Sequence, residues 1–198
     1  MNTKSTIPTF FVLAMAAKAV QAEPTAPQLA FFNQLSALCG QSFIGKVVED
    51  NQPSPAFSGE MLMHVRDCSA SEIQIPFVVG ENRSRTWIIS KTADGLRLKH
   101  QHKHQDGTDD VSTLYGGDTV SEGSANHQSF PADAYSKALF IRTRMPQSTG
   151  NTWHLYLYPQ DRFSYRLSRE GREFRVDFDL TKPVATPAAA WGAEKNSI

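Results

Sequence analysis

The sequence lacks a net charge and lacks an apolar run long enough to anchor it in a membrane. Lysine and arginine together number 20, as do aspartate and glutamate, so the formal net charge is +0. This balance gives no electrostatic reason to expect nucleic acid as a partner. The apolar run from Ile7 to Ala17 is too short to span roughly 30 Å of hydrocarbon. We therefore expect no stable membrane anchor.

Short catalytic motifs are also missing. The sequence has no G-x-S-x-G, H-E-x-x-H, Walker or dinucleotide-binding fingerprint. Serine, histidine and aspartate are present, but their pattern offers no activated nucleophile. The sequence does not support an enzyme, and a hydrolase or isomerase with a histidine general base remains a third hypothesis.

Cysteine is scarce. Cys39 and Cys68 are the two in the chain, and they form neither a C-x-x-C pair nor a zinc-knuckle spacing. In an exported protein an even count favours one disulfide, here closing a loop of about 30 residues. Two buried thiols are the alternative.

The N-terminus has the features of a signal peptide over residues 1–22. Lys4 precedes the apolar run, and Val20-Gln21-Ala22 places small side chains at the −3 and −1 positions of a cleavage site. Lys18 favours the alternative, an amphipathic helix of a cytoplasmic protein, and Ala19 offers a competing cleavage site. We expect an exported protein, either periplasmic or secreted.

The remaining chain divides into three parts. Residues 23–42 form a leader and a short helix, because Leu29, Phe32, Leu35 and Leu38 recur at helical spacing before Gly40. Residues 43–180 form the main domain, and residues 181–198 form a Pro/Ala-rich tail that is either disordered or laid across the surface.

Residues 43–180 alternate between apolar and polar side chains, as β-strands do. Asp94-Gly95, Asp106-Gly107 and Glu170-Gly171 supply the turn chemistry of hairpins. The fold class predicted is all-β, a single antiparallel up-and-down β-barrel of about 8–10 strands. Residues 133–139 fit a helical turn or a strand equally. The predicted strands are 60–66, 72–79, 85–90, 96–104, 111–119, 152–158, 163–168 and 174–180.

The most informative segment is the strand over residues 96–104. Its long polar side chains alternate with Leu96, Leu98, His100, His102 and His104. The three histidines therefore continue the core-facing row toward one end of the barrel. They are candidates for lining the barrel, for binding a ligand, or for titrating together near pH 6.5.

The same histidines are also candidate metal ligands. His100, His102 and His104 would need a further ligand, such as His64 or a nearby aspartate, to hold a divalent zinc or copper ion. The sequence does not establish whether a metal is bound.

A neighbouring strand holds further candidates. If Trp87 and Ile89 point inward, Arg83 and Arg85 lie near the barrel mouth, where they could hold a carboxylate or a phosphate. The opposite register leaves both arginines in solvent.

The start of the predicted barrel resembles a known family. A short helix followed by Leu38-Cys39-Gly40-Gln41-Ser42-Phe43-Ile44-Gly45-Lys46 and a strand meander is similar to lipocalin-like (calycin) barrels, including the nitrobindin-like ones. Residues 95–107 and 115–119 resemble uncharacterised exported bacterial proteins of that kind. The tryptophan of the lipocalin Gly-x-Trp pattern is missing. The resemblance implies a barrel around a small hydrophobic or haem-like ligand, with no functional residue carried over.

These observations favour an exported protein that binds a small molecule inside the barrel. The oligomeric state is left open. The candidate ligand-binding residues are His100, His102, His104, Arg83, Arg85 and Trp87.

Overall fold

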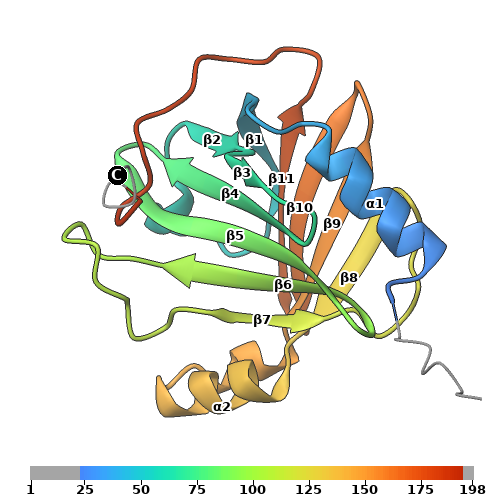
Figure 1. Cartoon of the computed structure of the whole chain (residues 1–198). Coiled ribbons are helices and arrows are strands. Elements are labelled where there is room, and N and C mark those ends of the chain that lie inside the picture. The colour runs from blue at the N-terminus through green and yellow to red at the C-terminus, as the bar shows by residue number, and fades with distance from the viewer. Residues whose placement is uncertain (1–22, 194–198) are drawn as a thin grey trace, which may run out of the picture.

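The computed structural model describes residues 23–193. The predicted signal peptide lies outside this range. Figure 1 shows a curved sheet flanked by two α-helices. The helical elements are α1 (Ala26–Ser36), η1 (Pro55–Phe57), α2 (Ala134–Arg142) and η2 (Pro146–Gly150). The strands are β1 (Ser42–Asp50), β2 (Met61–His64), β3 (Asp67–Cys68), β4 (Glu72–Val79), β5 (Asn82–Thr92), β6 (Gly95–His102), β7 (Tyr115–Asp118), β8 (His127–Pro131), β9 (Thr152–Tyr158), β10 (Arg162–Arg169) and β11 (Arg172–Asp179).

The strands form one nearly closed antiparallel barrel. Their order is β7-β6-β5-β4-β2-β1-β11-β10-β9-β8, and β3 pairs with β4 beside this path. The first strand, β1, pairs with the last, β11, and the other neighbours are consecutive or nearly so along the chain. The predicted all-β barrel with a short N-terminal helix is confirmed. The ladder is interrupted between β7 and β8, and we call this place the seam.

The core fills the inside of the barrel because apolar residues occupy alternate positions of the strands. In β11, for example, Phe174, Val176 and Phe178 are buried, and the residues between them are partly exposed. Aromatic side chains supply most of the large core groups. Fully buried examples are Trp87, Trp153, Phe31, Phe32, Phe43, Phe77, Phe130, Phe163, Phe174 and Phe178.

Helix α1 covers one end of the barrel. Its Phe31, Phe32 and Leu35 are buried in the core. Its Gln28 side chain donates hydrogen bonds to the Thr119 hydroxyl, at 2.9 Å, and to the Ser121 carbonyl, at 3.1 Å. These bonds place α1 at the end where β7 finishes.

The predicted disulfide is present. It joins Cys39, which follows α1, to Cys68 on β3, with the two Cα atoms 6.2 Å apart. The bridge therefore links the chain after the helix to the barrel wall.

Three segments differ from the sequence prediction or complete it. Residues 111–114, predicted as strand, form a turn, because the Asp110 carboxylate accepts hydrogen bonds from the backbone and hydroxyl of Ser112. Strand β8 was not predicted. The ambiguous segment from Asp133 is helix α2, since the Asp133 carboxylate accepts a hydrogen bond from the Ser136 amide and caps the helix.

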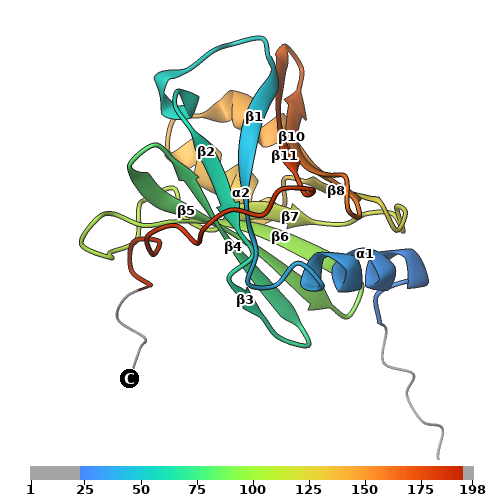
Figure 2. The ribbon, with the colours of Figure 1, turned by 90° about the horizontal axis from the view of Figure 1, so that it is seen from above.

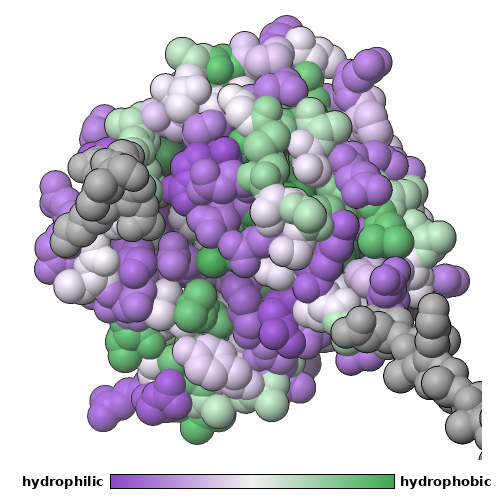
Figure 3. Space-filling view, in the orientation of Figure 1, coloured by the Kyte–Doolittle hydropathy of each residue, from purple (hydrophilic) through white to green (hydrophobic). Residues whose placement is uncertain are grey.

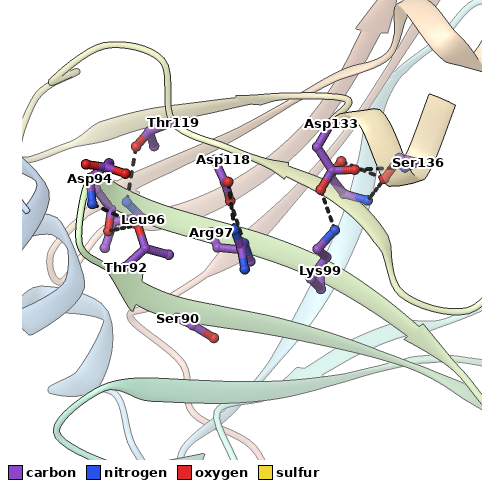
Figure 4. Close-up of polar contacts among 12 residues, drawn as sticks. Ser90, Thr92, Asp94, Leu96, Arg97, Lys99, Asp118, Thr119, Asp133 and Ser136 are labelled. Atoms are coloured by element: carbon purple, nitrogen blue, oxygen red, sulfur yellow. Dashed lines mark hydrogen bonds and ion pairs between the residues drawn. The ribbon is translucent and has the colours of Figure 1, made fainter. Parts of the chain in front are cut away.

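The seam is closed by glycines and by the start of α2. A Cβ atom on Gly117 would lie 1.8 Å from the Pro131 carbonyl oxygen, and one on Gly116 would lie 1.9 Å from that of Leu98. The Ser136 hydroxyl contacts both backbone groups of Gly116. Figure 4 shows Lys99 reaching the Asp133 carboxylate beside this helix end.

The C-terminal segment crosses the outside of the barrel from β1 to β5 (Figure 2). Val184 forms an isolated bridge with Ser42. The Trp191 amide then donates a hydrogen bond to the Arg83 carbonyl at 3.0 Å. None of the described helices has the length and apolar character needed to cross a membrane.

Candidate functional site

Only part of the histidine row lies inside the barrel. His100 is 3% exposed, and His102 is partly exposed at the end of β6. The expectation that His104 also lines the interior is wrong, because its side chain is 56% exposed. The strand ends at His102, and residues 104–108 form a turn around Asp106-Gly107, so the alternation of faces stops there.

His100 is held as a neutral imidazole inside the wall. Its Nδ1 lies 3.3 Å from the Tyr115 carbonyl oxygen, which can only accept, so Nδ1 carries the proton. Its Nε2 then accepts a hydrogen bond from the Tyr165 hydroxyl at 2.8 Å. Burial, followed by the nearby His102, lowers the pKa of His100 to about 3.

His102 lies one step nearer the opening. Its Nε2 is 3.1 Å from the Tyr115 hydroxyl. Burial lowers the pKa of His102 to about 4, and the positive charge of the nearby Arg85 is the second cause of this decrease. The imidazole is therefore uncharged at neutral pH and offers hydrogen bonds without charge.

His102 and both tyrosines line a half-open cavity of about 260 Å³. Tyr115 begins β7, and Thr119, which contacts α1, follows the other end of that strand. The cavity is therefore at the end of the barrel opposite α1. Its apolar and aromatic walls are Phe57, Phe140, Met145, Trp153, Leu167 and Phe174, and its polar edges are His102, Ser112, Tyr115, Ser148, Asn151 and Tyr165.

Trp87 and Ile89 face the interior, which is the register that brings Arg85 to the inner wall. Trp87 is 2% exposed and stacks on Tyr165, with ring centroids 4.6 Å apart and planes 5° apart. The indole packs against the core and against Tyr165, and Trp87 is not one of the residues that line the cavity.

Arg85 lies beside His102, its register partner on the neighbouring strand. Its guanidinium is 5.3 Å from the centre of the Phe57 ring, a wall of the cavity. Burial lowers the pKa of Arg85. Among the described residues, its buried Nη1 atom has no hydrogen-bond partner.

Arg83 does not join Arg85 in this site. Its Nη1 donates a hydrogen bond to the Ala189 carbonyl at 2.7 Å, so it holds the C-terminal segment against β5. Arg83 contacts the C-terminal segment and Arg85 contacts Phe57, so the two arginines do not form the single anion site that the sequence predicted.

The structure does not bring His64 to the histidine row. Met61 and Met63 point into the core, so His64 lies on the outer face of β2. Within residues 23–193 no group of three histidine, cysteine, aspartate or glutamate side chains is placed to hold a metal ion.

The residues of this end do not fit a haem iron. Both ring nitrogens of His100 are engaged, by the Tyr115 carbonyl and the Tyr165 hydroxyl. Ligation by His102 Nε2 would displace its contact with the Tyr115 hydroxyl. The cavity is also smaller than the roughly 300–1,000 Å³ of typical drug-sized ligand sites.

A second histidine cluster, not foreseen from the sequence, lies on the outer face of β8 and β9. The Ser129 hydroxyl is 3.0 Å from His127 Nε2 and 2.8 Å from His154 Nδ1. The other His154 nitrogen contacts Ser168 at 2.9 Å. The pairing of Ser129 with His154 across the strands creates the cluster, and this register could not be read from either segment alone.

The face in Figure 3 is mainly hydrophilic, with apolar side chains dispersed among polar ones.

Comparison of the chain with protein-family models, curated protein sequences and solved structures finds no match. The nearly closed antiparallel barrel is consistent with a calycin-like fold, and that architecture is all that supports the resemblance.

Proposed function

We propose that this protein binds one small organic molecule in the cavity at the barrel end opposite α1. The observation that carries the proposal is the composition of the cavity. Aromatic and aliphatic walls surround a few polar groups, which is the arrangement typical of small-molecule sites. The volume of about 260 Å³ favours a ligand the size of a substituted single ring.

The polar edge supplies orientation. The Tyr165 hydroxyl donates to His100 and can accept a hydrogen bond from a ligand, while the bonded pair of His102 and Tyr115 can donate one. These groups stay neutral at pH 7, because burial lowers the pKa of His102 to about 4 and raises that of Tyr115 to about 12. The same values favour binding over a histidine-based reaction, since His102 is a weak base at neutral pH.

Export to the periplasm or the medium remains part of the proposal. The Cys39–Cys68 disulfide supports it, because disulfides persist in oxidising compartments. It is tested by expressing the full chain and sequencing the N-terminus of the secreted or periplasmic product. Recovery of uncleaved chain from the cytoplasm alone would overturn it.

The binding proposal is tested with the full chain and three single-ring probes: benzoate, benzamide and phenol. Trp153 lines the cavity, so binding should change the tryptophan fluorescence and raise the melting temperature. Native mass spectrometry of the same sample gives the stoichiometry, expected to be one probe per chain.

A matched pair of variants locates the bound probe. Met145→Trp places a larger side chain in the cavity wall and should abolish binding. Ile141→Trp adds a similar bulk on α2, where the side chain is 60% exposed, and should leave binding unchanged. Failure of all three probes, or equal binding by the two variants, would refute the cavity as the site.

A further inference from the structure

Arg85 lies on the inner wall directly behind the cavity lining, next to His102 and Phe57. A second arginine, Arg172, lies over the Phe174 ring and pairs with Asp50. The register pairs Arg85 with His102 on one side and with Phe77 on the other, and Phe57 covers its guanidinium. His102 stays neutral at pH 7, so Arg85 and not His102 supplies the positive charge at this pair.

Within residues 23–193 Arg85 forms no ion pair, and the nearby Asp110 carboxylate is held by the backbone and hydroxyl of Ser112. None of the residues that line the cavity is acidic. In the described part of the chain, the salt bridges of the neighbouring strands involve other side chains, such as Arg97 with Asp118 and Lys99 with Asp133 on the outer face. The ion pairs of the described arginines involve residues other than Arg85, and the buried Nη1 atom of Arg85 has no hydrogen-bond partner among residues 23–193.

A buried donor without a partner carries a free-energy cost that a ligand can remove. A guanidinium presents parallel N–H groups that match the two oxygens of a carboxylate. The Tyr115 hydroxyl and the His102 imidazole are hydrogen-bonded to each other, so the pair can donate one further hydrogen bond to the same oxygens. Arg83 binds the C-terminal segment and Arg172 pairs with Asp50, so Arg85 is left to balance a single negative charge.

We propose that the ligand of the cavity is a small organic monocarboxylate, held through its carboxylate by Arg85 and through its ring or hydrocarbon body by the aromatic wall. This inference rests on the proposed function, since it names the ligand class of the same cavity. The body packs on Phe140, Trp153 and Phe174, and the carboxylate points to the wall formed by β5 and β6.

The test compares the affinities of benzoate and benzamide, which have nearly the same shape but differ in charge. At pH 7 benzoate should bind the wild-type chain at least tenfold more tightly than benzamide, measured by tryptophan fluorescence and calorimetry. Arg85→Gln should remove this preference while benzamide still binds. Arg85→Lys should keep part of it, since lysine retains the charge but not the planar fork.

A control shows whether the effect is local. Arg97→Gln removes the same charge from the outer face of β6, where Arg97 pairs with Asp118, and should leave the benzoate preference intact. The melting temperature of each variant reports whether it is folded. If Arg85→Gln is not folded, Arg85→Lys is compared with the wild type in its place.

The outcomes separate the two proposals. If benzoate, benzamide and phenol all fail to bind, the proposed cavity function fails, and if phenol alone binds, the carboxylate assignment is overturned. If benzamide and benzoate bind equally and Met145→Trp abolishes both, the cavity function stands and the carboxylate assignment is overturned. A preference for inorganic phosphate over benzoate would likewise overturn it.

Discussion

The Nε2 atom of His100 on β6 lies 2.8 Å from the hydroxyl oxygen of Tyr165 on β10, so one hydrogen bond spans the inside of the barrel. Both rings are also packed against Trp153 or Trp87. The bond requires a neutral imidazole that accepts at Nε2, and protonation of that nitrogen would end this acceptor role.

The first prediction concerns acid stability. The pKa of His100 is about 3 in the folded chain and near 6.5 when unfolded, so between these values the unfolded chain binds more protons. The free energy of unfolding should therefore fall as the pH is lowered from 6.5 toward 3, with His100 contributing at most about 5 kcal/mol. His100→Gln should flatten this decline in urea titrations from pH 7.5 to 4.

His104→Gln is the control for this experiment, because the His104 side chain is 56% exposed. Its unfolding free energy should follow the wild-type curve over the same pH range. Parallel curves for His100→Gln and the wild type would contradict the assignment of the acid sensitivity to His100.

The second prediction concerns the seam. Gly117→Ala would place a Cβ atom 1.8 Å from the Pro131 carbonyl oxygen, so β7 and β8 must separate. We expect a loss of about 1–3 kcal/mol or more in unfolding free energy. Gly150→Ala is the matched control, since its Cβ would meet nothing closer than 4.0 Å, and it should be nearly neutral. Equal melting temperatures of the two variants would argue against tight packing at the seam.

The third prediction concerns the disulfide. Cys39 and Cys68 are separated by 29 positions, and chain-entropy arguments give such a loop roughly 3–4 kcal/mol. The Cys39→Ala/Cys68→Ala double variant should lose about that much in denaturant titrations. Adding a reducing agent should destabilise the wild type and leave the double variant unchanged. A reductant effect on both proteins would point to another cause.

The fourth prediction concerns the start of α2. Asp133 caps the helix at Ser136 and pairs with Lys99, so Asp133→Ala should cost about 1–2 kcal/mol. Asp118→Ala breaks a more exposed pair with Arg97 and should cost less than about 1 kcal/mol. Both contacts appear in Figure 4. Thermal unfolding of the two variants measures the difference, and the reverse ranking would refute the capping role.

The sequence was sufficient for the architecture because alternation within a strand is a local property. It predicted the barrel, the bounds of β4 and β9, and the disulfide. It placed His104 inside because alternation alone does not mark where a strand stops. Here the Lys103 bridge to Asp109 and the turn that follows end the pattern.

The cavity depended on contacts between distant segments, which local patterns do not contain. Phe57 from η1 and Phe140 from α2 meet at one barrel end through tertiary packing. Arg85 was a candidate from its strand, but the register against β6 was needed to place it beside His102. The separation of Arg83 from that site follows from the C-terminal segment, which has no periodic signal.

The pairing of β1 with β11 also bears on the kinetics of folding. Most neighbouring strands are joined by short connections and can pair as hairpins soon after collapse, whereas Gly45 meets Phe178 from the far end of the barrel sequence. Closing so long a loop costs more chain entropy than any hairpin. The ring of strands is therefore expected to close late, after separate sheets have formed on either side of the seam.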